Sequence, residues 1–210
     1  MHLVAASRVP RYCVSIVMNQ QSLFGADEAP DAKPSKPLFS WFFALRPSPL
    51  EAQRVYEEAG QLLTARGVSG RRIDAARLHI TLEFLGDDVG DEVLQRACAA
   101  ADAVTFPGFA LHFDALMTFP IGSAPLVLVG SAGLDDVRKL HADLATALRD
   151  RGFKPKRSFE PHLTLCYDPR HRLARTAVDA IGFEARKIHL VKSHLGKSLH
   201  EVVRSWPLKG

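Results

Sequence analysis

The 210-residue chain has only three cysteines, Cys13, Cys98 and Cys166, and none of them forms a CxxC pair. A disulfide framework needs more cysteines than this, so the sequence predicts a protein of a reducing compartment, and we expect the cytoplasm. Long apolar runs are also absent, since no segment approaches the ~18 consecutive residues that a membrane-spanning helix requires. We therefore expect no membrane partner.

Motifs for metals and nucleotide cofactors are missing as well. The nine histidines include no HExxH pair or similar ligand spacing, and the chain has no GxxxxGK[ST] phosphate loop. The sequence thus predicts no metal and no cofactor, and it argues against the use of ATP. The formal net charge of +4 is a mild basic excess, which is compatible with an anionic substrate but does not identify one.

Residues 1–36 differ in composition from the rest of the chain. Their last part, residues 25–36, reads GADEAPDAKPSK, which is rich in alanine, proline and charge and lacks apolar periodicity. Such segments cannot bury enough apolar surface to offset the entropy of folding. The sequence therefore predicts a disordered N-terminal extension at 1–36 and a folded domain at 37–210, and nothing in it demands more than a monomer.

Within the domain, apolar periodicity predicts ten elements. Helical spacing and end signals indicate helices at 49–66, 90–104 and 134–150. Short apolar or aromatic runs indicate strands at 38–45, 78–85, 109–119, 125–129, 162–167, 183–191 and 200–206, the last two joined through Gly196. Several strands follow one another with only short turns between them. This order predicts an α+β fold with antiparallel sheets rather than a doubly wound parallel sheet.

Two of these elements carry sharper expectations. Ser48 is expected to cap the helix at 49–66. The inner face of that helix should hold Leu50, Val55, Ala59, Leu62 and Leu63. Along the strand at 109–119, alternation predicts two faces. Phe109, Leu111, Phe113, Ala115, Met117 and Phe119 should share one face, with His112, Asp114 and Thr118 on the other.

A four-residue motif occurs twice, as His79-Ile80-Thr81-Leu82 and as His162-Leu163-Thr164-Leu165. In a strand, alternate side chains point to opposite faces. Each copy therefore places an imidazole and a hydroxyl on one face and buries an aliphatic pair on the other. A single His-x-Thr is common and usually structural, but two copies in apolar strands, one in each half of the domain, favour a shared site.

Two such strands side by side would suit phosphodiester cleavage without a metal. One neutral imidazole can take a proton from an attacking water, while the other, protonated, gives a proton to the departing ribose oxygen. The ordinary histidine pKa of ~6.5 populates both forms near neutral pH. The hydroxyls of Thr81 and Thr164 can donate hydrogen bonds to phosphate oxygens on which charge develops. Phe42, Phe43 and Phe84 are candidates to line a base pocket, although core packing is expected for at least two of them.

At these residues the chain resembles the two-histidine phosphoesterase superfamily, in its LigT-like branch of RNA 2′,3′-cyclic phosphodiesterases, also called 2′-5′ RNA ligases. The resemblance covers residues 37–210. It rests on an aromatic first strand and on the contexts HITLEFLG at 79–86, FEPHLTL at 159–165 and SWPL at 205–208. It implies a bilobal fold of two pseudo-symmetric lobes, with antiparallel sheets lining a central cleft and helices outside.

The resemblance also implies a reaction and a partner. The partner is an RNA or nucleotide with a 2′,3′-cyclic phosphate end, hydrolysed to a 2′-phosphate, with weak reversible 2′-5′ joining. His79 would be the proton donor and His162 the acceptor. One position departs from the family pattern: an arginine often follows the second motif by two residues, and here Tyr167 stands there. The role of that arginine could pass to Arg170, Arg157 or Arg77, or Tyr167 itself could stack on a base. It is equally expected that Tyr167 is an ordinary aromatic residue of the strand without a role in binding.

Two other functions stay open at this point. A member of the same superfamily could act on small cyclic nucleotides or ADP-ribose cyclic phosphate, and product analysis on short RNAs and mononucleotides separates that case. A non-catalytic RNA-binding module could keep the fold without the chemistry. The matched pair of His79 and His162 argues against the second alternative, because binding alone does not require two imidazoles.

Overall fold

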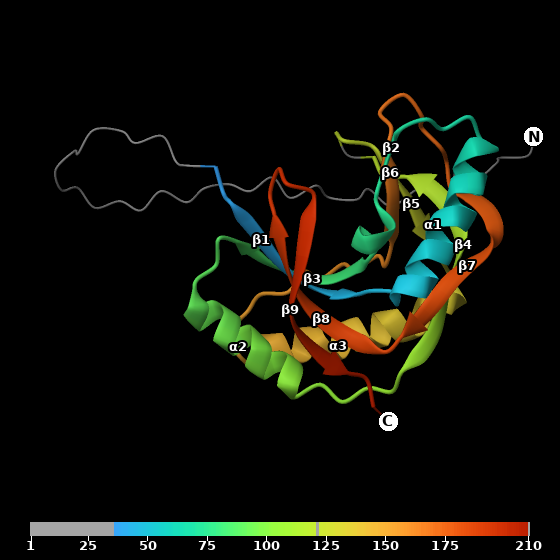
Figure 1. Cartoon of the computed structure of the whole chain (residues 1–210). Helices are drawn as coiled ribbons and strands as arrows, with labels where there is room; N and C mark the ends of the chain where they lie inside the picture. The colour runs from blue at the N-terminus through green and yellow to red at the C-terminus, as the bar shows by residue number, and fades with distance from the viewer. Residues whose placement is uncertain (1–35, 121, 210) are drawn as a thin grey trace, which may run out of the picture. The chain divides into compact units, whose positions relative to one another are not determined.

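The computed structural model describes residues 36–120 and 122–209. The predicted extension at 1–36 therefore lies outside the described residues, apart from Lys36, and stays a prediction. From Lys36 onward the chain forms one compact unit. Its described part contains two antiparallel sheets and three α-helices longer than ten residues (Figure 1). The predicted α+β class is confirmed.

The first sheet has the strand order β3-β1-β8-β9, and all neighbouring strands pair antiparallel. The central strand β1 is a short aromatic run between prolines, and it is buried from Trp41 to its end. This confirms the strand predicted at 38–45. The four strands are β1 (Phe39–Leu45), β3 (Ile80–Asp87), β8 (Lys187–His194) and β9 (Leu199–Pro207).

The second sheet has the order β2-β6-β5-β4-β7 and is antiparallel throughout. Every residue of β5 is buried, as its continuous apolar sequence predicts. Buried side chains from both sheets pack in one cluster, so the two lobes share one core. The strands are β2 (Arg71–Arg72), β4 (Phe109–Thr118), β5 (Pro125–Val129), β6 (Leu163–Tyr167) and β7 (Thr176–Ala185).

The two lobes repeat one arrangement. In each, a strand leads to a long helix and the chain then returns to the motif strand: β1, α1 and β3 in one, and β5, α3 and β6 in the other. In each sheet the motif strand pairs with the strand that precedes the helix. The helices are α1 (Pro49–Thr64), α2 (Asp91–Asp102) and α3 (Asp135–Arg149), with short 3₁₀ turns η1 (Ala75–Arg77) and η2 (Ala132–Leu134).

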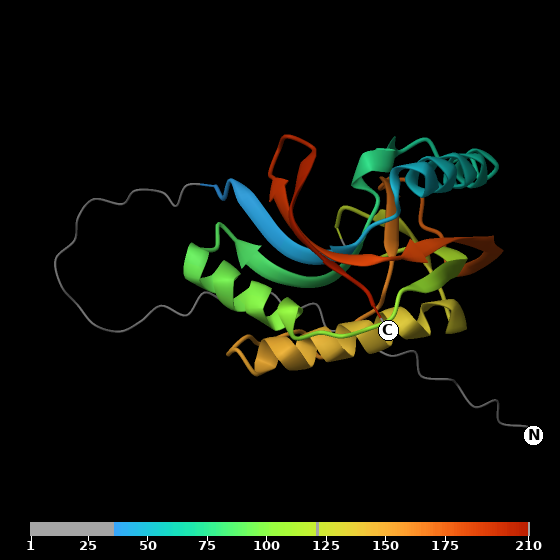
Figure 2. The same cartoon turned by 60° about the horizontal axis from the view of Figure 1, so that its bottom comes forward.

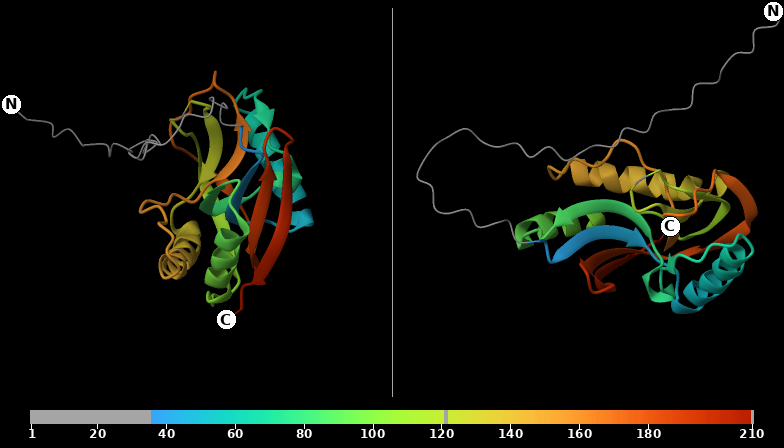
Figure 3. Two further views of the ribbon diagram at one scale, coloured as in Figure 1. Left: turned by 90° about the vertical axis from the view of Figure 1, so that its left-hand side faces the viewer. Right: turned by 90° about the horizontal axis from the view of Figure 1, so that it is seen from above.

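The helices lie outside the sheets, as predicted. Helices α2 and α3 pack against each other on one side, and α1 lies on the other side against β7 (Figures 2 and 3). Helix α1 begins with a capping box: Ser48 Oγ accepts a hydrogen bond from the backbone N–H of Glu51, and Glu51 in turn accepts one from the backbone N–H of Ser48 at 2.9 Å. The predicted cap is therefore confirmed.

The inner face predicted for α1 is partly wrong. Leu50 is 83% exposed, and Ala52 is buried in its place together with Val55, Ala59 and Leu63. The spacing of these four positions follows the helical period, whereas Leu50 stands five residues before Val55 and so points well away from their stripe. Leu62, at the edge of the stripe, is half-buried.

The simple alternation predicted along residues 109–119 also fails. Leu111 and Phe113 face the common core, but the pairing of β4 with β7 is irregular between Phe113 and Ala115. A bulge of this kind changes which face the following side chains occupy. Leu116 therefore joins the core, Thr118 is buried, and Ala115, Met117 and Phe119 turn to a separate small cluster.

The strand predicted at 183–191 is in fact two strands. Residues up to Ala185 end β7 in the second sheet, and residues from Lys187 begin β8 in the first. The apolar pattern continues across Arg186, so periodicity gives no sign of the change of sheet. The first half of β7 is largely exposed and was missed for that reason. The predicted pairing through Gly196 is confirmed as the β8–β9 hairpin, in which Gly196 has a φ of 77°.

Candidate active site

His79 and His162 occupy equivalent places, each at the residue before its motif strand. His79 Nδ1 lies 2.7 Å from the carbonyl oxygen of Arg77, and His162 Nδ1 lies 2.8 Å from the carbonyl oxygen of Glu160. A carbonyl only accepts, so Nδ1 carries the proton in both rings. Among the described residues neither Nε2 has a hydrogen-bond partner. Each neutral ring therefore keeps a free lone pair on Nε2.

The pairing of each motif strand with its neighbour is irregular at the leucine that ends the motif. In the pairing of β3 with β1, the register skips Leu82, and in the pairing of β6 with β5 it skips Leu165. An extra residue in one strand of a pair reverses the facing of the residues after it. Cys166 is consequently buried in the core, and Tyr167 is 42% exposed.

Phe84 occupies the position in the first motif strand that Tyr167 occupies in the second, and it is 46% exposed. Each of these two aromatic side chains lines a different cavity. Phe42 and Phe43 are buried, so the core packing expected for at least two of the three phenylalanines is confirmed, whereas nearly half of the Phe84 side chain is open to solvent. The two motif strands thus present three comparable groups: an imidazole, a half-buried threonine hydroxyl and an exposed aromatic ring.

The cavity at Phe84 joins the two lobes. It has a volume of about 180 Å³, and Thr81 of β3 and His162 of the second motif both line it. Thr81 and His162, one residue from each sequence motif, thus share this cavity, whereas His79 and Thr164 line neither this cavity nor the one at Tyr167. The remaining lining residues are Leu82, Glu83, His141, Lys156, Ser158, Phe159 and Glu160.

The cavity at Tyr167 is rich in arginine. It has a volume of about 230 Å³, and Arg71, Arg72 and Arg77 line it with Tyr167. Arg71 donates a hydrogen bond to Ser198 Oγ at 3.2 Å, so the tip of the β8–β9 hairpin borders this cavity. Asp74 contributes the single carboxylate among the lining residues, and Ile73 completes the wall. The balance of charge suits an anion.

Aromatic rings surround both histidines. The His79 ring stacks on Phe42, with centroids 5.1 Å apart, and meets the edge of His200 at 5.0 Å. The His162 ring meets Phe119 at 4.8 Å. Phe119 reaches this place because of the bulge in β4. The rings hold each imidazole in an environment of low polarity.

This environment changes the acidity of the histidines. Burial lowers the pKa of His79 to about 4, with smaller contributions from the positive charges of Arg46 and Arg77 and from His162. Burial also lowers the pKa of His162, where the carboxylate of Glu160 acts in the opposite direction. Both imidazoles are therefore mainly neutral at pH 7 in the free protein, and each can accept a proton.

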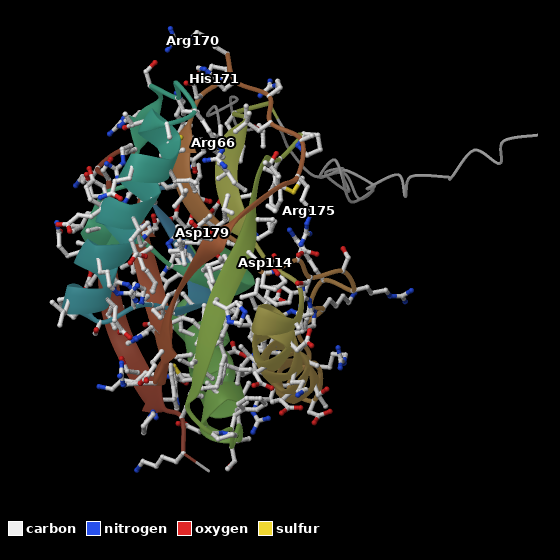
Figure 4. The ribbon with its side chains drawn as sticks, turned by 90° about the vertical axis from the view of Figure 1, so that its right-hand side faces the viewer. Arg66, Asp114, Arg170, His171, Arg175 and Asp179 are labelled. Carbon is white, nitrogen blue, oxygen red and sulfur yellow. The ribbon has the colours of Figure 1, made fainter. Side chains whose placement is uncertain are left out.

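Of the three arginines suggested as a substitute for the missing family arginine, Arg77 lies beside the candidate site. Arg77 lines the cavity of Tyr167, and its charge also lowers the pKa of His79. Arg170 is turned elsewhere, toward Ser69 Oγ at 3.1 Å and the buried carboxylate of Asp168 at 3.5 Å, at the outer end of the loop after β6 (Figure 4). Arg157 is exposed and lines neither cavity.

Sequence reasoning missed His200 and Arg46. His200 lies in β9, far along the chain from either motif, yet its ring touches the ring of His79. Burial lowers the pKa of His200 to about 3, and its buried Nδ1 has no hydrogen-bond partner among the described residues. Arg46 follows β1 and donates a hydrogen bond to the carbonyl of Ala76. Neither residue belongs to a local motif, so only the pairing of strands reveals them.

Two general features complete the description of the site. Between residues 36 and 209, Ile121 aside, no group of three or more His, Cys, Asp or Glu side chains is arranged to hold a metal ion. Among the described helices, none has the length and apolar character needed to cross a membrane.

Two antiparallel sheets that each carry one His-x-Thr-Leu strand to a common site define the architecture of a two-histidine phosphoesterase. The family model of the 2′-5′ RNA ligase superfamily matches residues 51–197. This match covers more than half of the chain, which therefore belongs to the 2′-5′ RNA ligase superfamily. Among solved structures, Escherichia coli LigT in its apo form is similar, with a TM-score of 0.67, 20% identity, and coverage of 83% of this chain and 100% of LigT.

Curated relatives are similar over shorter stretches. An RNA 2′,3′-cyclic phosphodiesterase of Archaeoglobus fulgidus is 36% identical over 101 residues, which cover 47% of this chain and 57% of the relative. One of Methanocaldococcus jannaschii is 27% identical over 145 residues, covering 64% of this chain and 82% of the relative. The chain thus spans 57% of the length of the first two curated relatives that it matches.

Proposed function

We propose that the protein hydrolyses 2′,3′-cyclic phosphate ends of RNA to 2′-phosphates, with His79 and His162 as its acid–base pair. The observation that carries this proposal is the equivalent presentation of two imidazoles from two sheets. Each donates Nδ1–H to a backbone carbonyl and leaves Nε2 free. The relatives named RNA 2′,3′-cyclic phosphodiesterase support the substrate class.

In the proposed reaction, one imidazole takes a proton from water as the water oxygen attacks phosphorus. The bond between phosphorus and O3′ breaks, and the second, protonated imidazole gives its proton to O3′. The products are a 2′-phosphate and a 3′-hydroxyl, and no metal is needed to balance the step. If a 5′-hydroxyl replaces water as the nucleophile, the same pair joins two RNA ends through a 2′-5′ bond, which we propose as a weaker activity.

The neighbouring groups bind the phosphate and the RNA chain. The hydroxyls of Thr81 and Thr164 donate hydrogen bonds to the non-bridging oxygens, where negative charge grows in the transition state. Arg77 and Arg46 supply positive charge beside His79. The arginine cavity at Tyr167 then receives the phosphates of the nucleotides that precede the cyclic end, because RNA carries one negative charge on each of them.

We retain His79 as proton donor and His162 as acceptor. The free protein keeps His79 neutral, so the proton that His79 donates must be acquired when the anionic substrate binds. A bound phosphate favours the charged form of both rings and raises their pKa values. The cyclic phosphate is therefore the group that is cleaved, and its negative charge also favours the protonated form of His79 that assists the cleavage.

The test uses purified protein, EDTA and an RNA oligonucleotide that ends in a 2′,3′-cyclic phosphate. The product should be a 2′-phosphate, and His79→Ala and His162→Ala should each lower kcat by roughly 10²–10⁴-fold, the usual contribution of a positioned general acid or base. His112→Ala is the matched control, because His112 is an exposed histidine of β4 away from both motifs. Activity that survives in both motif variants would refute the assignment of the site.

A further inference from the structure

The side chain of Glu83 is mostly buried and lines the cavity that Thr81 and His162 share. The residue is only 8% exposed, although it lies in a motif strand whose other inward side chains are apolar. Its Oε2 is 3.5 Å from His141 Nε2, and no donor among the described residues makes a hydrogen bond to either oxygen. Polar groups in mostly buried positions are usually hydrogen-bonded. This position therefore calls for a ligand that brings donors.

The cavity that Glu83 lines has the size and walls of a base site. Its volume of about 180 Å³ is smaller than the roughly 300–1,000 Å³ of pockets for drug-sized ligands, so it suits one ring system rather than a whole nucleotide. Phe84 and Phe159 provide aromatic walls, and Phe159 is held in place by His141, whose ring stacks on it at 3.9 Å. Unstacked RNA bases bind in this way, against aromatic rings and with their Watson–Crick edges hydrogen-bonded.

The place of the cavity identifies which base it would hold. Thr81 and His162 line it together with Glu83, so it opens directly onto the proposed site of the cyclic phosphate. The base nearest to that phosphate belongs to the terminal nucleotide itself. The arginine cavity at Tyr167 would then bind the phosphates of the nucleotides that precede the terminal one.

We propose that this cavity binds the terminal nucleobase and that Glu83 makes it selective for guanine. The inference rests on the proposed function. Guanine alone among the four bases presents two adjacent donors on its Watson–Crick edge, N1–H and the 2-amino group, which match the two oxygens of a carboxylate. Adenine and cytosine place an acceptor beside their amino group, and uracil flanks its single N–H with two carbonyls. Each of these three would set an acceptor against an oxygen of Glu83.

The expected selectivity follows from the strength of such a pair. A good bidentate contact to a base discriminates by about 1–3 kcal/mol, which corresponds to roughly 5–150-fold. The contact exists before and during the reaction, so it should act mainly on KM rather than kcat. Lys156 and Ser158 at the rim add polar contacts that do not distinguish guanine from the other bases.

The experiment compares the 2′,3′-cyclic phosphates of guanosine, adenosine, cytidine and uridine as substrates. For the wild type, kcat/KM should be about 10–100-fold higher for guanosine than for the other three. Glu83→Gln should lower kcat/KM for the guanosine substrate and so remove most of this preference. Glu92→Gln, an exposed carboxylate on α2, is the control and should keep the wild-type ranking.

The outcomes separate this inference from the proposed function. Equal kcat/KM for all four substrates in the wild type, or a guanine preference that survives in Glu83→Gln, would overturn the role of Glu83 and leave the hydrolysis proposal standing. A uniform loss of activity on all four substrates in Glu83→Gln would mean that Glu83 is structural, and would also overturn the inference. No hydrolysis of any mononucleotide or of the cyclic-ended RNA would instead refute the proposed function. Because the ranking in the wild type needs no variant, the inference stays testable even if Glu83→Gln does not fold.

Discussion

The lowered pKa of His79 has a measurable consequence for the pH dependence of the reaction. With a pKa of about 4 in the free protein, only roughly one molecule in a thousand carries a charged His79 at pH 7. The proposed mechanism requires one charged and one neutral imidazole. In the free protein at neutral pH both rings are mainly neutral, so the proton that His79 is proposed to donate has to be gained when the substrate binds.

Binding of the substrate should restore much of the lost basicity. Two unit charges about 5 Å apart interact by about 3 kcal/mol at an effective dielectric constant of about 20. Since 1.36 kcal/mol corresponds to a factor of ten in the protonation equilibrium, a bound phosphate should raise the pKa of His79 and favour its charged form by roughly a hundredfold. The effect of the anion thus offsets most of the effect of burial, and the charged fraction at pH 7 rises about a hundredfold.

The pH profiles of kcat/KM and kcat test this reasoning, because the first reports the free protein and the second the complex. The optimum of kcat/KM should lie below pH 6.5, and the optimum of kcat should lie one to two units higher. A direct measurement would follow the His79 ring by NMR with and without inorganic phosphate, and its pKa should rise on addition of phosphate. Coincident profiles with an optimum above pH 7, together with a His79 pKa that phosphate does not change, would refute the argument.

Three further predictions concern single side chains. His200→Phe should stabilise the protein by about 2 kcal/mol more at pH 5 than at pH 8, measured by urea unfolding. The pKa of His200 is about 3 in the folded state and ~6.5 in the unfolded state, so the wild type loses stability as the pH falls below ~6.5. An equal effect of the substitution at both pH values would contradict this. Arg77→Gln should raise KM for cyclic-ended RNA by roughly tenfold, the loss of one charge-assisted hydrogen bond, with little change in the unfolding midpoint. Ser48→Ala should lower the free energy of unfolding by about 1 kcal/mol and leave kcat unchanged, and an unchanged unfolding midpoint would show that the capping box contributes nothing.

Much of the fold could be predicted because local patterns carry it. The long helices have a clear apolar stripe and end signals, and the central strands are short apolar runs between prolines or glycines. The prediction failed where geometry depends on a partner strand. The irregular pairing after Phe113 and the change of sheet at Arg186 leave no trace in apolar periodicity, because both are set by the neighbouring strands rather than by the residues themselves.

The candidate site could likewise be predicted only where local sequence patterns carry it. His79, Thr81, His162 and Thr164 were found because their spacing repeats and because alternation places each pair on one face of a strand. His200 could not be found, since it comes to His79 from β9, which lies three positions away from β3 in the sheet. The arginine cavity was hidden for a related reason, as its residues come from β2, η1 and the tip of a hairpin that only the fold brings together.

The two motifs also show how a repeated sequence produces a site with unlike halves. Both motif strands bulge at the motif leucine, so the position that follows it turns inward and the next turns toward a cavity. The inward position is Glu83 in one strand and Cys166 in the other, and the outward position is Phe84 or Tyr167. Shared backbone geometry keeps the two imidazoles equivalent, and the residues just after each motif make one flanking cavity acidic and aromatic and the other basic. A substrate with a base at one end and phosphates at the other can bind such a site in only one direction. In the proposed reaction, the direction of binding would then decide which histidine is the donor and which is the acceptor.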